Sequence, residues 1–451
     1  MSEPIIAGFY PDPTVCRVGD DYYLAHSSFE YFPGAPIWHS RDLIRWTQIG
    51  HILTRRSQFA RGDCRPSSGL YAGTLRHHDG RFVYVTTNVS DFDGGQLIVT
   101  ADDPAGPWSE PVRVPEAIGI DPDLAWDDDG TCYLSWKAMS PTEGEIGIRQ
   151  APLDISSGKF LAPAYPIWQG SGLAAAEGPH LYAIDGLWYL LLAEGGTERG
   201  HAVTVARGPH PSGPFEGCAA NPILSHRSTI HPVQNTGHAD LVRAPGGGWA
   251  AVYLGTRPRG WTPGFHVLGR ETFLAGIDWV DGWPVFDEDR YQVPPLDTGF
   301  TEVFGDSPPH LRWVADGSGL RCTRVRDLRW SAEATLDGPG RFEVRIDDRH
   351  AYGLTRHHDR VEATARVGDL GAVLATLPVA DGHTVLRIEA VPPPSRDAGP
   401  DEIVLSAGSH ELARLDGRYL STEVASGFTG RMLATAGPHV RSVTYRPQEQ
   451  P

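Results

Sequence analysis

Residues 11–24 read PDPTVCRVGDDYYL, and the order of features in this stretch recurs along the chain. Asp12 precedes a proline, whose ring disfavours the helical region for Asp12 and holds that residue extended. A turn at Gly19-Asp20 follows, and then the aromatic strand 22–24. Because Asp-Pro is a common turn-forming dipeptide, Asp12 gains importance only through the recurrence.

Four more copies share the same plan, in which a lead residue precedes a Gly-containing turn and a second, apolar strand. Asp-Gly suits a type I′ hairpin turn, because both central residues adopt positive φ. The lead residues are Asp12, Tyr71, Asp121, Glu177 and His238, and their turns are Gly19-Asp20, Asp79-Gly80, Asp129-Gly130, Asp185-Gly186 and Gly246-Gly247-Gly248.

Most copies continue with an outer strand and a turn that ends in an aromatic residue, as in residues 38–46, 97–108 and 203–215. Repeats of about four antiparallel strands are typical of propeller blades. We therefore predict an all-β fold with a five-bladed β-propeller, the alternative being a sandwich with evenly spaced hairpins. In a propeller the first strand of each blade lines the central channel, so the five lead residues would face one pocket.

Composition agrees with a large all-β protein. The 451 residues include 52 glycines and 38 prolines, and this length predicts two domains. The net charge of −17 argues against nucleic acid and anionic membranes as partners and suits a neutral substrate. No run of about 20 apolar residues is present that could span a bilayer.

The cysteines and the N-terminal residues indicate a cytoplasmic location. Residues 1–4 have neither the basic nor the apolar region of a signal peptide. The cysteines are scattered without CxxC spacing, which predicts small buried side chains rather than disulfides or a zinc site. They are Cys16, Cys64, Cys132, Cys218 and Cys322.

Ordered motifs over the first 290 or so residues resemble glycoside hydrolase family 43, in its two-domain β-xylosidase and α-L-arabinofuranosidase branch. The motifs are IIAGFYPDP (5–13), VGDDYYL (18–24), SSFEYFPG (27–34), IDP (120–122), EGPH (177–180), EGGT (194–197), TGHADL (236–241) and LGRETF (268–273). The resemblance implies an inverting enzyme on a five-bladed propeller. It implies that Asp12 is the general base, Glu177 the general acid, and Asp121 the residue that orients and tunes this pair.

Inverting hydrolysis asks for the same roles. One ionised carboxylate activates water while one protonated carboxyl group protonates the leaving oxygen. A third carboxylate near the acid raises the pKa of that acid and keeps it protonated near neutral pH. The small apolar run 172–176 before Glu177 would add desolvation.

The resemblance also implies substrate-binding residues. Phe29 and Tyr71 would provide walls for the apolar face of the sugar, and Arg257 would bind sugar hydroxyls. His238 would lie on the propeller axis and hold a water or a Ca²⁺ ion, although the sequence has no dense acidic loop, so such an ion would be mostly hydrated. No cofactor is expected to be required.

The second-blade motif departs from the family pattern. Residues 69–73 read Gly-Leu-Tyr-Ala-Gly where Gly-Ile-Trp-Ala-Pro is expected. This departure leaves the choice between xylose and arabinose open.

The predicted domains are a catalytic propeller over residues 1–295 and an accessory β-sandwich over residues 300–447. Residues 293–296 form a plausible linker, and alternating patterns at 341–346 and 384–388 predict strands of the sandwich. In the family branch such a sandwich packs against the propeller and favours exo action on short chains. A free-standing carbohydrate-binding domain is the alternative.

We therefore expect an inverting exo-hydrolase that releases β-D-xylose from the non-reducing end of short xylo-oligosaccharides. An α-L-arabinofuranosidase, a bifunctional enzyme and a non-catalytic carbohydrate-binding propeller are the alternatives. A retaining fructosidase is disfavoured because its Asn-Asp-Pro-Asn motif is absent. The expected partner is a small oligosaccharide, and assembly into a homo-oligomer stays open.

Overall fold

The computed structural model describes residues 3–59, 65–140, 144–305, 307–395 and 397–448, and its regular structure is almost entirely β-strand. Contacts divide the chain into two compact units. The first, here the propeller unit, comprises Met1–Ile6, Tyr10–Gly255 and Thr272–Pro294. The second, here the sandwich unit, comprises Ala7–Phe9, Thr256–Glu271 and Pro295–Pro451.

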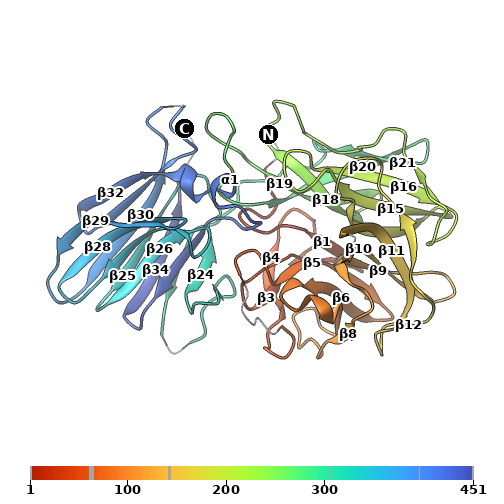
Figure 1. Cartoon of the computed structure of the whole chain (residues 1–451), viewed down its shortest axis with the longest axis horizontal. Helices are drawn as coiled ribbons and strands as arrows, with labels where there is room; N and C mark the ends of the chain where they lie inside the picture. The colour runs from red at the N-terminus through yellow and green to blue at the C-terminus, as the bar shows by residue number, and fades with distance from the viewer. Residues whose placement is uncertain (1–2, 60–64, 141–143, 306, 396, 449–451) are drawn as a thin grey trace. The chain divides into compact units, whose positions relative to one another are not determined.

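The propeller unit consists of five antiparallel sheets, each built from consecutive strands (Figure 1). This arrangement is the predicted five-bladed β-propeller. The first blade has β1 (Thr14–Val18), β2 (Asp21–Ala25), β3 (Gly34–Ser40) and β4 (Thr47–Leu53), and the second has β5 (Leu70–His78), β6 (Arg81–Asn88), β7 (Gln96–Ala101) and β8 (Val112–Val114), with η1 (Val89–Gly94). The third blade has β9 (Gly119–Trp126), β10 (Cys132–Ser140), β11 (Gly144–Asp154), β12 (Lys159–Phe160) and β13 (Tyr165–Trp168). The fourth has β14 (Glu177–Ile184), β15 (Leu187–Glu194), β16 (Ala202–Gly208) and β17 (Glu216–Gly217), and the fifth has β18 (Gln234–Arg243), β19 (Trp249–Thr256), β20 (Glu271–Val280) and β21 (Trp283–Asp287).

The predicted hairpin chemistry is confirmed in two blades. Asp79 and Gly80 have φ of 48° and 75° between β5 and β6, and Asp185 and Gly186 have φ of 50° and 80° between β14 and β15. Two successive positive φ values are the signature of the type I′ turn, which matches the twist of the strands it joins.

The ring of blades is closed by residues from both ends of the propeller unit. Ile6 forms an antiparallel bridge with Thr272 in β20, and the Ile5 N–H donates to the Thr272 carbonyl at 2.9 Å. The first residues of the unit thus pair with its last blade.

Apolar clusters fill the spaces between neighbouring blades. One cluster joins Ile37 of the first blade to Leu75 and Leu97 of the second. Four similar clusters join the second and third, third and fourth, fourth and fifth, and fifth and first blades. Burial between sheets therefore holds the blades together and leaves the axis to other side chains.

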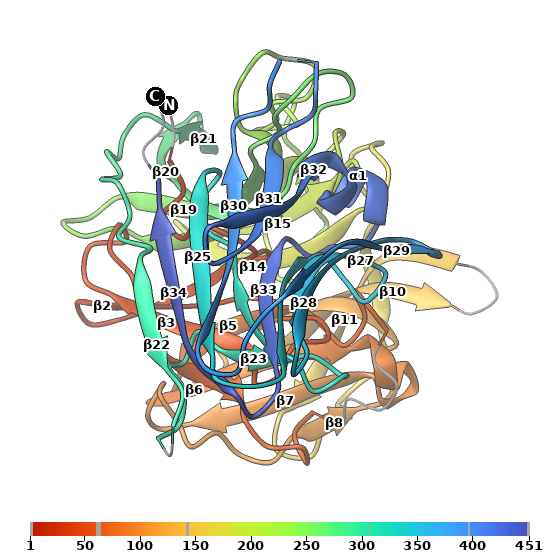
Figure 2. The same ribbon diagram turned by 90° about the vertical axis from the view of Figure 1, so that its left-hand side faces the viewer.

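The sandwich unit contains two antiparallel sheets of six and seven strands (Figure 2). The six-stranded sheet has β22 (Phe300–Val303), β34 (Val440–Pro447), β25 (Trp330–Leu336), β30 (Thr384–Val391), β31 (Glu402–Ala407) and β32 (His410–Asp416). The seven-stranded sheet has β23 (Val314–Ala315), β24 (Arg321–Arg324), β33 (Met432–Ala436), β26 (Gly340–Arg345), β27 (His350–Arg356), β28 (Arg360–Val367) and β29 (Leu370–Pro378). Two short helices, η2 (Gly417–Leu420) and α1 (Thr422–Ala425), follow β32.

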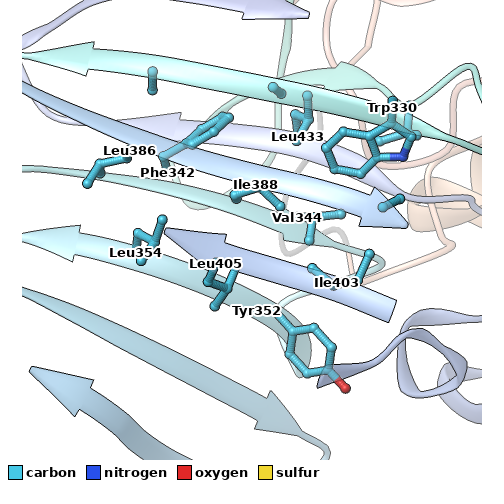
Figure 3. Packing of buried hydrophobic residues seen from close by; sticks show 14 of the residues in the cluster. Trp330, Phe342, Val344, Tyr352, Leu354, Leu386, Ile388, Ile403, Leu405 and Leu433 are labelled. Carbon is cyan, nitrogen blue, oxygen red and sulfur yellow. The ribbon is translucent and has the colours of Figure 1, made fainter. Parts of the chain in front are cut away.

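Side chains from both sheets form one apolar core (Figure 3). Phe342 and Leu354 come from the seven-stranded sheet, and Leu386 and Ile388 from the six-stranded one; all four are fully buried. The apolar residues of the alternating pattern thus lie on the strand face that is turned towards the core, as predicted for a sandwich.

Two further predictions concern thiols and membrane helices. Cys16, Cys132, Cys218 and Cys322 are buried free thiols, whereas Cys64 lies outside the described residues. Across the described ranges, no helix has the length and apolar character needed to cross a membrane.

Candidate active site

Three carboxyl groups, of which two are buried and one is half-buried, lie in or next to the inner strands of different blades. Asp12 lies just before β1, Asp121 lies in β9, and Glu177 begins β14. Asp12 and Asp121 are 4% and 6% exposed. Burial, the charge of Glu177 and the charge of Asp12, in that order, raise the pKa of Asp121 well above its usual range. The structure therefore brings the three sequence-predicted carboxyl groups into one electrostatic environment.

The backbone at these positions adopts a left-handed conformation that repeats between blades. Asp12, Asp121 and His238 have φ of 53°, 55° and 47°, and Gly178 has φ of 56°. The extended conformation expected for Asp12 before Pro13 is therefore wrong. In β9 and β14 the strand pairing shifts at this point, which marks a β-bulge. Bulges re-aim side chains and are frequent next to functional sites.

The register differs from the sequence prediction by one residue in two blades. The positive φ falls on Asp12 and Asp121 in the first and third blades, but on Gly178 and not Glu177 in the fourth. The first and second blades both have a two-residue turn. Asp12 is six residues before Val18, the last paired residue, and six residues before His78 is Ala72, not Tyr71. Glu177 and Tyr71 thus precede the equivalent position, because the spacing of turns does not reveal where the bulge falls.

Gly178 links two of the other site residues. Its N–H donates a hydrogen bond to the Asp121 carboxylate. A Cβ atom on Gly178 would lie 2.8 Å from Nε2 of His238, closer than packed atoms approach. Glycine at this position therefore combines the positive φ with room for the imidazole.

Asp12 is held by two polar neighbours. The Ser27 hydroxyl donates to Oδ2 of Asp12 at 2.5 Å, and Nδ1 of His238 lies 3.5 Å from Oδ1. Burial lowers the pKa of His238 to about 4, with His180 adding to the effect and Asp12 opposing it. His238 is therefore neutral at pH 7 and does not act on Asp12 as a cation.

Lys137 is a site residue that the sequence reasoning missed. Its Nζ donates to Oε2 of Glu177 at 2.9 Å, and its side chain is only 5% exposed. Lys137 also opposes the increase in the pKa of Asp121. It lies in β10, the second strand of its blade, whereas the lead residues predicted from the repeat belong to first strands.

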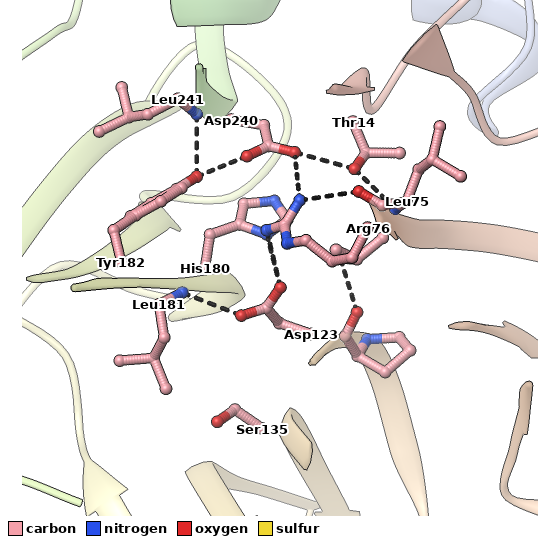
Figure 4. Close-up of polar contacts among 12 residues, drawn as sticks. Thr14, Leu75, Arg76, Asp123, Ser135, His180, Leu181, Tyr182, Asp240 and Leu241 are labelled. Carbon is pink, nitrogen blue, oxygen red and sulfur yellow. Dashed lines mark hydrogen bonds and ion pairs between the residues drawn. The ribbon is translucent and has the colours of Figure 1, made fainter. Parts of the chain in front are cut away.

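A second group of polar side chains, from the inner strands of the blades, is joined by hydrogen bonds and ion pairs (Figure 4). We call it the axial cluster, and its members are Thr14, Arg76, Asp123, His180, Tyr182 and Asp240. Arg76 is central, with Nη1 at 2.9 Å from Asp240 and Nη2 at 2.8 Å from Asp123. Both aspartates have no exposed surface.

The remaining bonds connect the axial cluster to every blade. Tyr182 donates to Asp240 at 2.5 Å, and the Thr14 hydroxyl donates to the other oxygen at 2.8 Å. Nδ1 of His180 lies 3.3 Å from Asp123. Thr14, Asp123, His180 and Asp240 stand two residues after Asp12, Asp121, Gly178 and His238. Because strand residues two apart share a face, this spacing is the signal by which the sequence could have revealed the cluster.

The predicted aromatic walls contact each other. The rings of Phe29 and Tyr71 are edge to face, with centroids 5.2 Å apart. Phe29 is only 2% exposed, whereas Tyr71 is half-buried and its hydroxyl donates to the Ser67 carbonyl. Tyr71 is therefore the member of this pair with ring surface available to a ligand.

Arg257, predicted to bind sugar hydroxyls, belongs by its contacts to the sandwich unit. Its Nε and Nη2 donate to the two oxygens of Glu271 at 2.7 and 2.9 Å. Glu271 has no exposed surface and also accepts the Gly8 N–H at 2.9 Å. The bidentate pair fixes the guanidinium plane of Arg257.

The side chains near His238 offer few ligand atoms to the predicted Ca²⁺ ion. Calcium prefers six to eight oxygen ligands. Among the described residues, no group of three or more His, Cys, Asp or Glu side chains is arranged to hold a metal ion. The imidazole of His238 and the carboxylate of Asp12 do not by themselves fit a directly bound calcium ion.

Known proteins resemble this chain in sequence and in structure. It is 50% identical over 369 residues to a xylosidase/arabinosidase of Butyrivibrio fibrisolvens, a match that covers 79% of this chain and 65% of the relative. It is 42% identical over 331 residues to a xylan 1,3-β-xylosidase of a Vibrio species, covering 69% and 60%. These matches span less than two thirds of the length of either relative.

A solved xylan β-1,4-xylosidase of Bacillus halodurans superposes with a TM-score of 0.85 at 26% identity, over 99% of this chain and 98% of that one. The sequence profile of glycosyl hydrolases family 43 matches residues 1–284. This span contains the three carboxyl groups, the axial cluster and all five blades except the end of β21, and the chain belongs to glycosyl hydrolases family 43.

Proposed function

We propose that this protein is an inverting exo-glycoside hydrolase that releases β-D-xylose from the non-reducing end of short xylo-oligosaccharides. The observation that carries the proposal is that the charges of Glu177 and Asp12 act on the buried carboxyl group of Asp121 and raise its pKa. Relatives named β-xylosidase and xylosidase/arabinosidase support the choice of sugar.

In this proposal Asp12 is the general base. Ser27 and His238 orient its carboxylate, which takes a proton from the water that attacks the anomeric carbon. Water attacks from the face opposite the leaving oxygen, so the configuration inverts.

Glu177 is the proposed general acid, and Asp121 is its partner. Two neighbouring carboxyl groups in a buried site cannot both ionise easily, so together they retain a proton. The raised pKa of Asp121 supports this retention. Glu177 then delivers a proton to the leaving oxygen, and Lys137 stabilises the carboxylate that remains.

The proposal also includes the finer expectations drawn from the sequence. Residues 1–295 would be the catalytic domain and residues 300–447 an accessory sandwich. Tyr71 would contact the sugar, as would Phe29 and Arg257, and no cofactor would be required; a hydrated Ca²⁺ near His238 is the least supported element. The four buried free thiols and the charge of −17 support a cytoplasmic protein without nucleic-acid or membrane partners, whose assembly into homo-oligomers stays open.

Hydrolysis of 4-nitrophenyl β-D-xyloside and 4-nitrophenyl α-L-arabinofuranoside tests the function. We expect the xyloside to have the higher kcat/KM, and NMR to detect α-D-xylose as the first-formed anomer. A higher value for the arabinofuranoside would favour the alternative that the relative named α-L-arabinofuranosidase supports. First-formed β-D-xylose would contradict inversion.

Glu177→Gln separates the acid from the base. Because nitrophenolate leaves without much protonation, this variant should lose far more activity on xylobiose than on the nitrophenyl xyloside. Equal losses on the two substrates would contradict the acid role. Binding of xylobiose without turnover by the unmodified protein would instead favour the non-catalytic carbohydrate-binding propeller.

A further inference from the structure

A second cavity opens into the propeller unit away from the three carboxyl groups. Its volume is about 600 Å³, within the range of ordinary ligand pockets of roughly 300–1,000 Å³. Every blade contributes to its lining through the later part of its first strand. The residues that matter below are Arg17, His78, Trp126, Trp188, Arg243 and Trp249.

The axial cluster lies between this cavity and the carboxyl groups. Along β9, Asp121 comes first, Asp123 of the cluster second and Trp126 of the cavity last. At about 3.3 Å per strand residue, Asp121 and Trp126 are roughly 17 Å apart along the strand. Arg76 and Tyr182 belong to the cluster and also line the cavity. The cavity is therefore separate from the proposed active site.

Three tryptophans from three blades provide aromatic walls. Trp126, Trp188 and Trp249 are half-buried and line the cavity. Within the part of the chain that the structure describes, none of their indole N–H groups donates to a protein acceptor. Rigid indole faces pack against the C–H groups of a sugar ring, and a free N–H can donate to its oxygens.

Two of these rings are already held in place by cationic or titratable side chains. The ring of His78 stacks on Trp126 with centroids 4.2 Å apart and an interplanar angle of 9°. Cζ of Arg243 lies 4.2 Å from the ring centroid of Trp249. These contacts fix two of the walls before a ligand arrives.

The charge of the lining differs from that of the whole protein. The chain carries a net charge of −17, yet none of the described residues that line this cavity bears a carboxylate. Arg76 is neutralised by two aspartates, and Arg17 pairs with Asp20 at 3.5 Å. Arg243 is exposed, and the described residues supply it with no carboxylate partner. One uncompensated guanidinium suits one negative charge rather than a polyphosphate.

We propose that this cavity is a second saccharide-binding site and that its ligand is a sugar ring bearing a carboxylate, a uronic acid unit. The tryptophans pack against the ring, and Arg243 pairs with the carboxylate in the fork geometry that guanidinium groups offer to carboxylates. The inference does not depend on the proposed hydrolysis, because no residue of the carboxyl site takes part in it.

The test is titration of the full-length protein with methyl β-D-glucuronide and, separately, with methyl β-D-xyloside. Tryptophan fluorescence and saturation-transfer NMR measure the binding. Arg243→Ala should weaken glucuronide binding by about tenfold or more, the value of a charge-assisted hydrogen bond. Arg207→Ala is the matched control, because Arg207 lies 4.1 Å over the ring of Trp283 in the same kind of pair outside this cavity. This control should leave binding unchanged.

Three results would overturn the proposal: no glucuronide binding by the unmodified protein, equal losses in the two arginine variants, or no loss in Arg243→Ala. Binding of the neutral xyloside should not depend on Arg243. Hydrolysis of nitrophenyl xyloside by Arg243→Ala should equal that of the unmodified protein. A failure of hydrolysis would therefore concern only the proposed function, and a failure of the titration only this cavity.

Discussion

The axis of the propeller unit and the interior of the sandwich unit are filled by opposite kinds of side chain. In the axial cluster, buried charges and hydroxyl groups from all five blades bond to one another (Figure 4). In the sandwich, hydrocarbon side chains from two sheets interlock (Figure 3). The apolar contacts of the propeller lie between its blades instead.

This difference has a physical consequence for how each region tolerates change. A buried ion pair that loses one partner leaves an uncompensated charge. An apolar core that loses a methyl group leaves only a small cavity. The axis can therefore carry charged chemistry next to it, because its polar groups are already satisfied, but its members depend on one another.

Among the changes near the propeller axis, Asp12→Asn should have the largest effect, and this effect is on kcat. Loss of a general base lowers rates by about 10²–10⁴-fold, and kcat for nitrophenyl xyloside should fall by that factor without loss of folding. Unlike Glu177→Gln, the variant should lose similar activity on xylobiose. Ile388→Val in the sandwich core is the control and should retain full kcat. Activity of Asp12→Asn within tenfold of the unmodified protein would contradict the base role.

Arg76→Met should destabilise the protein by about 3–5 kcal/mol at pH 7, because it leaves Asp123 and Asp240 buried without a cation. Although burial opposes it, Arg76 helps to lower the pKa of Asp240 to about 2. Without Arg76 this pKa rises and Asp240 can be protonated in mild acid, so the loss should shrink towards pH 4. Urea unfolding at several pH values measures the free energy of unfolding of the variant and of the unmodified protein.

Arg207→Met is the control for that experiment, since Arg207 contacts Trp283 and backbone carbonyls rather than a buried carboxylate. It should cost less than about 1 kcal/mol. A pH-independent loss in Arg76→Met would mean that packing, not charge, explains the role of Arg76. If that variant does not fold, Arg76→Lys retains the charge and should be intermediate.

His238→Asn should change how stability depends on pH. The pKa of His238 is about 4 in the folded protein and about 6.5 when unfolded. The unfolded chain therefore binds a proton first, so this histidine costs nothing above pH 6.5 and lowers stability by up to about 3 kcal/mol as pH falls through 4. Asp121, whose pKa is raised, acts with the opposite sign.

The contribution of His238 is thus read from the difference between the protein and the variant. Urea unfolding from pH 7 to pH 4 should show a shallower decline for His238→Asn. Parallel curves for the two proteins would show that His238 gains its proton at an ordinary pH.

Thr14→Val and Ile388→Val compare the two interiors with changes of similar size. The valine at position 14 removes the hydroxyl that donates to Asp240 and accepts the Leu75 N–H. We expect a loss of about 1–3 kcal/mol, because two buried polar groups lose a partner. Ile388→Val should cost about 0.5–1.5 kcal/mol. Equal losses would remove the distinction between the two regions.

Lys137→Met should have the smallest effect, which is on the pH dependence of the reaction. Lys137 lowers the pKa of Asp121, so removal of its charge should raise this pKa and move the pH optimum of kcat upward. Lys137→Arg should restore the optimum if charge is what matters. An unchanged profile, with only KM altered, would make Lys137 a purely structural neighbour of Glu177.

The sequence revealed the parts of the fold that depend on local chemistry. The Asp-Gly turns at 79–80 and 185–186 mark hairpins because positive φ restricts which residues fit. Their even spacing led to five blades. The same spacing placed Glu177 and Tyr71 one residue out of register, because bulges add a residue without any composition signal.

The missing parts of the site depend on contacts between blades. Arg76 reaches Asp240, which is 164 residues later, so nothing in its local sequence identifies the pair. Lys137 reaches Glu177 from a second strand. Thr14, Asp123 and Asp240 had a usable sequence signal, because each follows a lead residue by two positions.

The bridge between Ile6 and Thr272 also determines when the ring of blades can close during protein synthesis. Thr272 follows Ile6 by 266 residues, and at about 5–20 residues per second a ribosome needs on the order of tens of seconds to add them. During that interval the last blade is incomplete, and Ile6 has no partner strand. The ring of blades can therefore close only after Thr272 has been added.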